Sequence, residues 1–144
     1  LDILGNDIKQ DVMKNKNLKN IKFVSKNSIF SKADIIFLCV DLNKRSKHLL
    51  NLAAFKKMKK NPIIINICRG PVINEKDLYT ALKKKMISGA ALDVYEKEPI
   101  DKKNILLKFE NCIFNSHNSY NTIEEVRNVH LNTIKNLLKG LNER

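Results

Sequence analysis

The sequence predicts an α/β fold in which a parallel β-sheet carries helices on both faces. Short apolar runs rich in β-branched residues alternate along the chain with segments of helical periodicity. These runs are almost continuously apolar, which is typical of strands that are buried on both sides. With 144 residues, of which 43% are hydrophobic, the chain can bury one core. We expect strands at Leu1–Leu4, Ile21–Val24, Ile35–Val40, Ile63–Cys68, Ala90–Val94 and Cys112–Phe114.

Three segments have the apolar spacing of amphipathic helices. Asn74, followed by an aspartate three residues later, has the pattern of an N-terminal helix cap. Gly89 and Gly140 stand where the second and third helices are expected to stop. The predicted helices are Ser46–Lys59, Asn74–Met86 and Ile123–Lys139, the last within a C-terminal helical segment that covers residues 121–144.

The chain is strongly basic, with 27 lysines and arginines against 15 acids and a net charge of +12. Such a balance can indicate a nucleic-acid partner, which would bind with a steep salt dependence. The lysines, however, form short groups on helical stretches and show no regular aromatic pattern. We therefore interpret them as a solvated surface and expect no nucleic-acid partner.

Neither a membrane span nor a secretion signal is expected. No apolar run approaches the ~18 residues that suggest a span. The first residues, LDILGNDIKQ, lack a basic stretch followed by an apolar one. These features favour a cytoplasmic protein that does not enter a membrane.

The three cysteines, Cys39, Cys68 and Cys112, are far apart and lie in apolar runs. The number is odd and no CxxC motif is present, which argues against a disulfide framework or a zinc site. We expect small core residues in a reducing compartment and no metal site.

Polar and charged residues follow the predicted strands. In a parallel α/β sheet, ligands bind beyond the carboxyl ends of the strands. Asp7, Arg69, Glu98 and His117 each come after one of the apolar runs. The sequence thus predicts that acids, an arginine and a histidine gather along one rim of the sheet.

Three segments, INICRGPVINEKDLYTAL, ISGAALDVYEKEP and SHNSYNT, occur in this order along the chain. They resemble the consecutive signatures of the D-isomer-specific 2-hydroxyacid dehydrogenases, of the kind found in D-3-phosphoglycerate dehydrogenase. The resemblance extends from about Asp7 to the last helix. It implies a Rossmann-type NAD-binding domain and hydride transfer between NAD and a 2-hydroxy or 2-keto acid, with 3-phosphoglycerate as a first guess.

The resemblance also implies catalytic roles. Arg69 matches the arginine that grips the substrate carboxylate, His117 the acid/base, and Glu98 the carboxylate that pairs with the histidine. Glu96, two residues earlier, is the alternative carboxylate. These residue types suit the chemistry, because a guanidinium binds a carboxylate with two hydrogen bonds and an imidazole can take and return a proton near neutral pH. By the residues alone, each could also be an ordinary turn or surface residue.

For the cofactor, the resemblance implies an acid that holds the adenosine ribose and several residues that line the pocket, mostly through their backbone. Asp7 matches this acid, and its charge disfavours the 2′-phosphate of NADP. Lys44 and Arg45 lie nearby in the sequence, however, so NADP stays open as a cofactor. The residues concerned are Asp7, Val40, Ile67, Asp93, His117 and Asn118.

Two departures from the family stand out. The chain has four glycines and no GxGxxG, so the first strand and its glycine-rich turn are lacking, as is most of the substrate domain. The strands that end near Asp7 and Val40 should then have no common neighbour. We expect residues 1–144 to be a partial NAD-binding domain with little activity alone; a non-catalytic NAD-sensing or interaction module is the alternative.

The second departure follows His117, where Asn118-Ser119-Tyr120-Asn121 replaces the Gly-Ala-Ser-Thr usual in phosphoglycerate dehydrogenases. This leaves the substrate open among 2-hydroxy acids. The family usually dimerises through this domain, so the resemblance also implies a homodimer.

Overall fold

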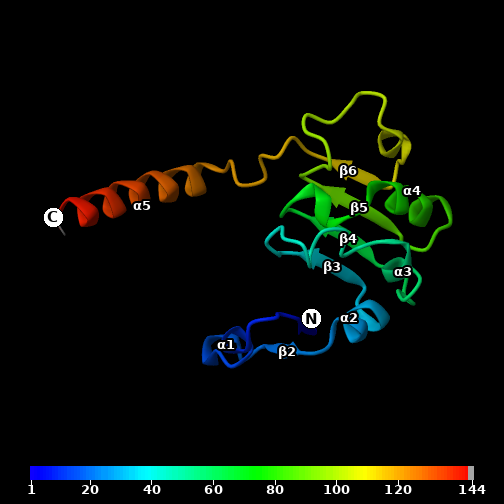
Figure 1. The fold of residues 1–144 in the computed structure, drawn as a ribbon, viewed down its shortest axis with the longest axis horizontal. Helices are drawn as coiled ribbons and strands as arrows, with labels where there is room; N and C mark the ends of the chain where they lie inside the picture. The colour runs from blue at the N-terminus through cyan, green and yellow to red at the C-terminus, as the bar shows by residue number, and fades with distance from the viewer. Residues whose placement is uncertain (143–144) are drawn as a thin grey trace.

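The computed structural model describes residues 1–142 and contains two parallel β-sheets (Figure 1). The smaller sheet pairs β1 (Ile3–Gly5) with β2 (Ile21–Phe23). The larger has the order β3-β4-β5-β6. Every strand expected from the sequence is present, and the α/β class is confirmed. The strands of the larger sheet are β3 (Ile35–Leu38), β4 (Ile63–Asn66), β5 (Gly89–Leu92) and β6 (Cys112–Phe114).

The two sheets are separate because β1 and β3 share no hydrogen-bonded neighbour among the described residues. In the doubly wound order 3-2-1-4-5-6, the first strand lies between the second and the fourth. The observed division matches a sheet of this kind without its first strand. The expectation that the strands ending near Asp7 and Val40 have no common neighbour is confirmed.

The core lies on one face of the larger sheet. Alternate strand residues such as Ile36 and Ile64 are buried there and pack with Phe30, Phe55 and Leu78 from the helices. The prediction of helices on both faces is wrong for the described residues, because the opposite face of the larger sheet is exposed and apolar; it carries Ile35, Phe37, Ile63 and Ile113. The helices that contribute to the core are α2 (Lys26–Lys32), α3 (Leu52–Phe55) and α4 (Glu75–Lys83).

The helix predicted over Ser46–Lys59 is wrong except for its middle, because only α3 forms there. The backbone of Leu50 is used elsewhere: its N–H donates to the Val72 carbonyl and its own carbonyl accepts from Asn74. This parallel bridge holds the chain extended, and Asn51 then caps α3 through a hydrogen bond from the Ala54 N–H.

Asn74 caps α4 as predicted, since its side chain accepts from the Asp77 N–H at 3.1 Å. Gly89 is not a helix stop, and that prediction is wrong. The helix ends at Lys83, and Gly89 instead begins β5, where a Cβ would collide with the Asn111 carbonyl. The remaining helical turns are α1 (Gln10–Met13), η1 (Lys16–Leu18), η2 (Gly70–Val72) and η3 (Ile105–Lys108).

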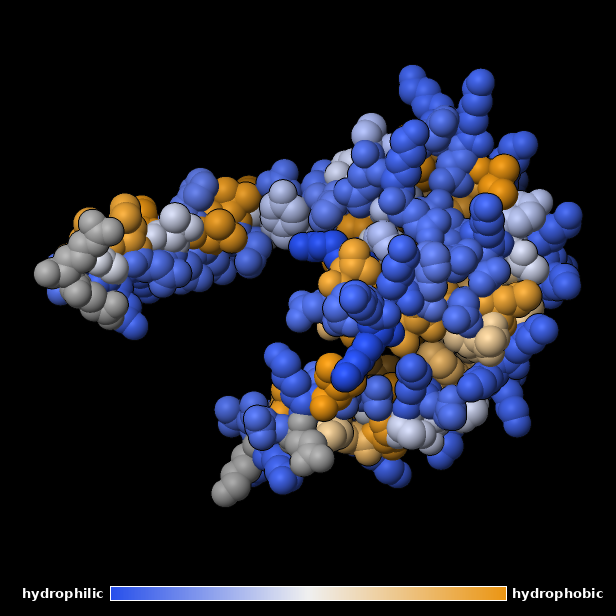
Figure 2. Space-filling view, viewed as in Figure 1, coloured by the Kyte–Doolittle hydropathy of each residue, from blue (hydrophilic) through white to orange (hydrophobic). Residues whose placement is uncertain are grey.

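The last helix, α5 (Ile123–Asn142), extends away from the sheets (Figure 1). It passes through Gly140, so the predicted stop there is wrong. None of its described residues is buried, and apolar side chains lie along its length (Figure 2). No helix within residues 1–142 is both long and apolar enough to cross a bilayer.

The cysteines are all free, but only two behave as expected. Cys68 and Cys112 are half-buried and pack against the core. Cys39 is exposed because it follows β3 on the uncovered side, so the prediction that it is a core residue is wrong.

Candidate active site

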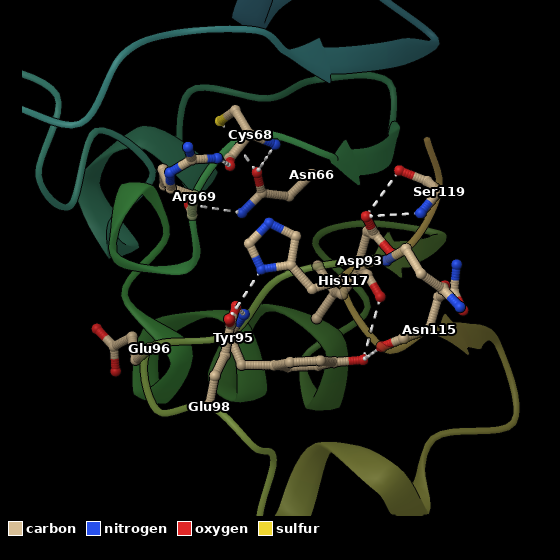
Figure 3. A network of polar contacts seen from close by, with 12 residues as sticks. Asn66, Cys68, Arg69, Asp93, Tyr95, Glu96, Glu98, Asn115, His117 and Ser119 are labelled. Carbon is tan, nitrogen blue, oxygen red and sulfur yellow. Dashed lines mark hydrogen bonds and ion pairs between the residues drawn. The ribbon is translucent and has the colours of Figure 1, made fainter. Parts of the chain in front are cut away.

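The carboxyl ends of β4, β5 and β6 converge on one cavity of about 470 Å³. Parallel strands place their following loops at the same edge, so residues far apart in the chain meet there. Four of the residues singled out in the sequence contribute to its wall, and Figure 3 shows three of them together. The lining consists of Ile67, Arg69, Asp93, His117, Ser119, Tyr120 and Thr122, with Glu125 from the first turn of α5.

His117 is paired with Glu98. The ring Nδ1 lies 2.8 Å from Oε2 of Glu98 (Figure 3). A carboxylate can only accept, so Nδ1 carries the proton and Nε2 of the neutral ring is an unprotonated base. His117 has a φ of 57°, a left-handed backbone that a non-glycine residue adopts only when its surroundings hold it.

Glu98 is held as a charged carboxylate. The hydrogen bond from His117 lowers the pKa of Glu98, and a second bond from the Tyr95 N–H, at 3.0 Å, acts in the same direction. The positive charge of Arg69 lowers it further. Glu98 is therefore suited to fix the tautomer of the histidine rather than to exchange protons itself.

Glu96 has a different partner. Its Oε1 lies 2.7 Å from Nε2 of His48, and Figure 3 shows its side chain turned away from His117. Of the two candidate carboxylates, Glu98 is thus the one that contacts His117, as the resemblance implied.

Arg69 stands at the rim in the loop that follows β4 and is exposed. One guanidinium nitrogen, Nη1, donates to the Cys68 carbonyl at 2.6 Å, and within residues 1–142 no carboxylate forms an ion pair with it. Its backbone is fixed because Asn66 donates to the Arg69 carbonyl at 3.1 Å. The remaining donors of the guanidinium are free to bind an anion in the cavity.

Asp93 connects β5 to the loop after β6. Its buried carboxylate accepts from the Asn118 N–H, the Ser119 N–H and the Ser119 hydroxyl. Burial raises the pKa of Asp93, but these hydrogen bonds outweigh burial and the net shift is downward. Asp93 thereby holds the loop that carries His117 in place.

The other residues predicted to bind cofactor are more dispersed. Ile67 lines the cavity and Asn118 contributes its backbone N–H to Asp93. Val40 packs against the core, outside the cavity lining. Asp7 follows β1 in the separate sheet, where its Oδ1 accepts from the Lys9 N–H at 2.8 Å.

Sequence reasoning missed several residues that support the site. Asn66 lies within a run of isoleucines, and a polar residue in such a run could have indicated a role in the site. Tyr95 donates its hydroxyl to the Asn115 carbonyl at 2.7 Å and so ties β5 to β6. His48 and Glu75 act on the loop near Glu98 from distant segments, for which no local signal exists.

A family model described as "D-isomer specific 2-hydroxyacid dehydrogenase, NAD binding domain" matches residues 1–119. The chain belongs to this family. Among its curated relatives, the glyoxylate reductase of Thermofilum pendens is 40% identical over 107 residues, which cover 74% of this chain and 32% of the relative. The D-3-phosphoglycerate dehydrogenase of Methanocaldococcus jannaschii is 40% identical over 117 residues, or 79% of this chain and 22% of the relative.

Solved structures agree with this membership. An acyclic imino acid reductase in complex with NADPH and D-Arg superposes with a TM-score of 0.86 at 26% identity, over 99% of this chain and 44% of that one. A glyoxylate reductase from Paecilomyes thermophila superposes with a TM-score of 0.79 at 27% identity, over 94% of this chain and 40% of that one. This member of the 2-hydroxyacid dehydrogenase family thus spans less than half the length of the proteins it resembles.

The residues that would hold NAD in this family member lie in two separate places. Arg69, Asp93 and His117 line the cavity of about 470 Å³. Asp7 presents a half-buried acid at the end of β1, a position suited to ribose hydroxyls. The phosphates have no glycine-rich turn in the chain, whose four glycines form no GxGxxG.

Proposed function

We propose that the chain is part of an NAD-dependent oxidoreductase that transfers hydride between the nicotinamide and a 2-hydroxy or 2-keto acid. The observation that carries this proposal is the 2.8 Å contact of His117 Nδ1 with Glu98, at a cavity that Arg69 also lines. A proton-transfer pair beside an anion-binding group is what oxidation of a hydroxy acid requires. The assigned roles are Arg69, Glu98 and His117 for catalysis, and Asp7, Val40, Ile67, Asp93, His117 and Asn118 for the cofactor.

In this mechanism, Arg69 binds the substrate carboxylate and sets the orientation of C2. The unprotonated Nε2 of His117 takes the hydroxyl proton as C2 is oxidised, and returns it in the reverse direction. Glu98 keeps the proton on Nδ1 and stabilises the imidazolium that forms. The nicotinamide, when bound, supplies or accepts the hydride.

The proposed reaction can be tested with the full-length protein. Reduction of a panel of 2-keto acids, with glyoxylate, hydroxypyruvate and 3-phosphohydroxypyruvate among them, is followed by absorbance with NADH and with NADPH. The proposal expects turnover of at least one acid with a preference for NADH. No turnover of any 2-keto acid or 2-hydroxy acid by a folded, cofactor-binding protein would refute it.

The relatives point to candidate substrates within this class. Relatives include both glyoxylate reductase and D-3-phosphoglycerate dehydrogenase, so 3-phosphoglycerate is one candidate. Asn118 and Ser119 occupy the positions after the histidine, and Asp93 holds both through their backbone. We further propose a cytoplasmic homodimer, as is usual for the family, in which residues 1–144 are the later part of the NAD-binding domain.

The alternative is a non-catalytic NAD-sensing or interaction module. The separation of β1-β2 from β3-β4-β5-β6 favours it for the chain alone, because a central strand and the phosphate-binding turn are not among its residues. The intact contacts of Glu98 and His117 favour the enzyme. Binding of NADH without turnover by the full-length protein would support the module.

A further inference from the structure

The Glu75 carboxylate reaches from the first turn of α4 to the loop that carries Glu98. Its Oε1 accepts from the Glu96 N–H at 2.7 Å and its Oε2 accepts from the Asn104 side chain at 3.0 Å. Both oxygens are therefore occupied by the segment that follows β5. A carboxylate that accepts two hydrogen bonds in a half-buried place restrains the backbone it contacts.

A second side chain fixes the same loop residue. Nε2 of His48 lies 2.7 Å from Oε1 of Glu96, and the His48 N–H donates to the Pro71 carbonyl at 2.8 Å. His48 has a φ of 52°, so its own backbone is held in a sparsely populated conformation. Glu96 is thus restrained at its backbone by Glu75 and at its side chain by His48.

The Glu96 amide, which Glu75 restrains, directly follows the Tyr95 amide, which orients Glu98. The Tyr95 N–H donates to Oε1 of Glu98, and the other oxygen of Glu98 contacts His117. Since the amides of Tyr95 and Glu96 are consecutive, rotation of this short segment would move both. The Tyr95 hydroxyl, bonded to the Asn115 carbonyl, restrains the segment on its other side.

We propose that Glu75 and His48 are positioning residues for the proposed proton-transfer pair: by fixing Glu96, they hold the Tyr95 amide where it directs Glu98 toward Nδ1 of His117. Neither residue lines the cavity, so they act through the loop and not on substrate. The catalytic consequence rests on the proposed function, whereas the effect on the histidine tautomer does not.

The chain provides a matched control. Glu75 and Asp77 are both acids of the first turn of α4, where they interact favourably with the helix dipole. Asp77, however, accepts from the Leu52 N–H of α3 at 2.8 Å and has no hydrogen bond to the loop. Asp77→Ala therefore removes a comparable acid and hydrogen bond, while it leaves Glu96 restrained.

The first measurement is the tautomer of His117 in the full-length protein, read from the ¹⁵N shifts of the ring at a pH where it is neutral. We expect the proton on Nδ1 in the wild type and in Asp77→Ala. Glu75→Ala should shift the ring toward the Nε2–H tautomer, because the carboxylate that holds Nδ1–H is no longer directed at it. An unchanged tautomer in Glu75→Ala would overturn the proposal.

The second measurement is steady-state kinetics. Glu75→Ala should lower kcat by about 10- to 100-fold, the size expected for a displaced catalytic group, with KM little changed because Arg69 is untouched. The kcat of Glu75→Gln should lie between those of the wild type and Glu75→Ala, since its single amide oxygen can still accept from Glu96 but not also from Asn104. His48→Asn tolerates the left-handed backbone but cannot reach Glu96, and its kcat should fall less than that of Glu75→Ala.

The two hypotheses fail separately. If the full-length protein has no dehydrogenase activity but Glu75→Ala still changes the tautomer, the proposed function is refuted and the positioning role stands. If the enzyme is active and Glu75→Ala matches Asp77→Ala in both kcat and tautomer, the positioning role is refuted and the function stands.

Discussion

At the scale of single residues, the proposed chemistry depends on a charged side chain that is exposed and yet fixed. Arg69 projects from the end of β4 with its backbone held by Asn66, and Gly70 follows it because a Cβ there would collide with the backbone of Tyr95. The arginine is thus held next to the loop of Glu98.

Arg69→Ala should raise KM for the acid by about 10- to 100-fold, the effect of losing charge-assisted hydrogen bonds to a carboxylate. Arg69→Lys should recover part of the loss, since lysine keeps the charge without the bidentate geometry. KM for NADH, measured in the same assays, should change little. An equal increase for acid and cofactor would contradict the assigned role.

His117→Asn should lower kcat by about 100-fold or more, because the proton acceptor is removed. Asparagine is the better replacement here, as it tolerates the φ of 57° that alanine does not favour. Thermal unfolding should show a folded protein, which separates catalysis from stability. A variant with near-normal kcat would refute His117 as the acid/base.

Glu98 gives a prediction on pH and stability. Its folded pKa lies below the ordinary value of 4.5, mainly through the bond from His117, so the unfolded chain binds more protons near that value. The stabilisation is complete above the ordinary value and is lost as the pH falls through the depressed pKa. Urea unfolding of the full-length protein should therefore lose stability on acidification less steeply in Glu98→Gln than in the wild type.

The exposed Glu110 provides the comparison for that experiment. Glu110→Gln should follow the wild type through the acid range. If Glu98→Gln and Glu110→Gln have the same pH dependence, the stabilising contact of Glu98 with His117 is absent in solution.

At the scale of elements, the strands could be predicted because their apolar runs are local signals. The same holds for Asn74, whose cap is made within three residues. The segment 46–51 could not be predicted, since Leu50 bonds to residues more than twenty positions later. Arg69, Glu98 and His117 were found through motif order, whereas the contacts of Glu75 and His48 join distant segments and leave no pattern.

Two glycines give opposite predictions at this scale. Gly70→Ala should destabilise the protein by about 1–3 kcal/mol, because η2 must move away from the backbone of Tyr95. Gly140 lies within α5 and a Cβ there meets nothing within 4 Å, so Gly140→Ala should stabilise the helix by about 1 kcal/mol. Urea unfolding tests the first and helical circular dichroism the second. A stable Gly70→Ala variant together with a Gly140→Ala variant of lower helicity would contradict the placement of both residues.

At the scale of the whole molecule, the described residues form two separate sheets. Asp7 and the cavity belong to different sheets, with no strand of residues 1–142 bonded to both. A cofactor that must reach from one to the other has no phosphate-binding turn between them. Under the proposed function, the catalytic residues lie on the rim, but the surface that would hold a dinucleotide beside them is incomplete.

The 144-residue chain by itself should therefore show less than about 1% of the turnover of the full-length protein, the loss expected when cofactor positioning is removed. Initial rates with NADH and the preferred keto acid, at matched concentrations, give the comparison. Normal turnover by the isolated chain would show that the two sheets suffice.

The exposed face of the larger sheet has a consequence for how the chain behaves outside catalysis. Ile35 and Phe37 of β3, Ile63 of β4 and Ile113 of β6 are exposed on the same face of this sheet. Surfaces of this kind drive self-association in destabilised proteins and are bound by chaperones. The 144-residue chain with this face uncovered should thus self-associate as its concentration rises.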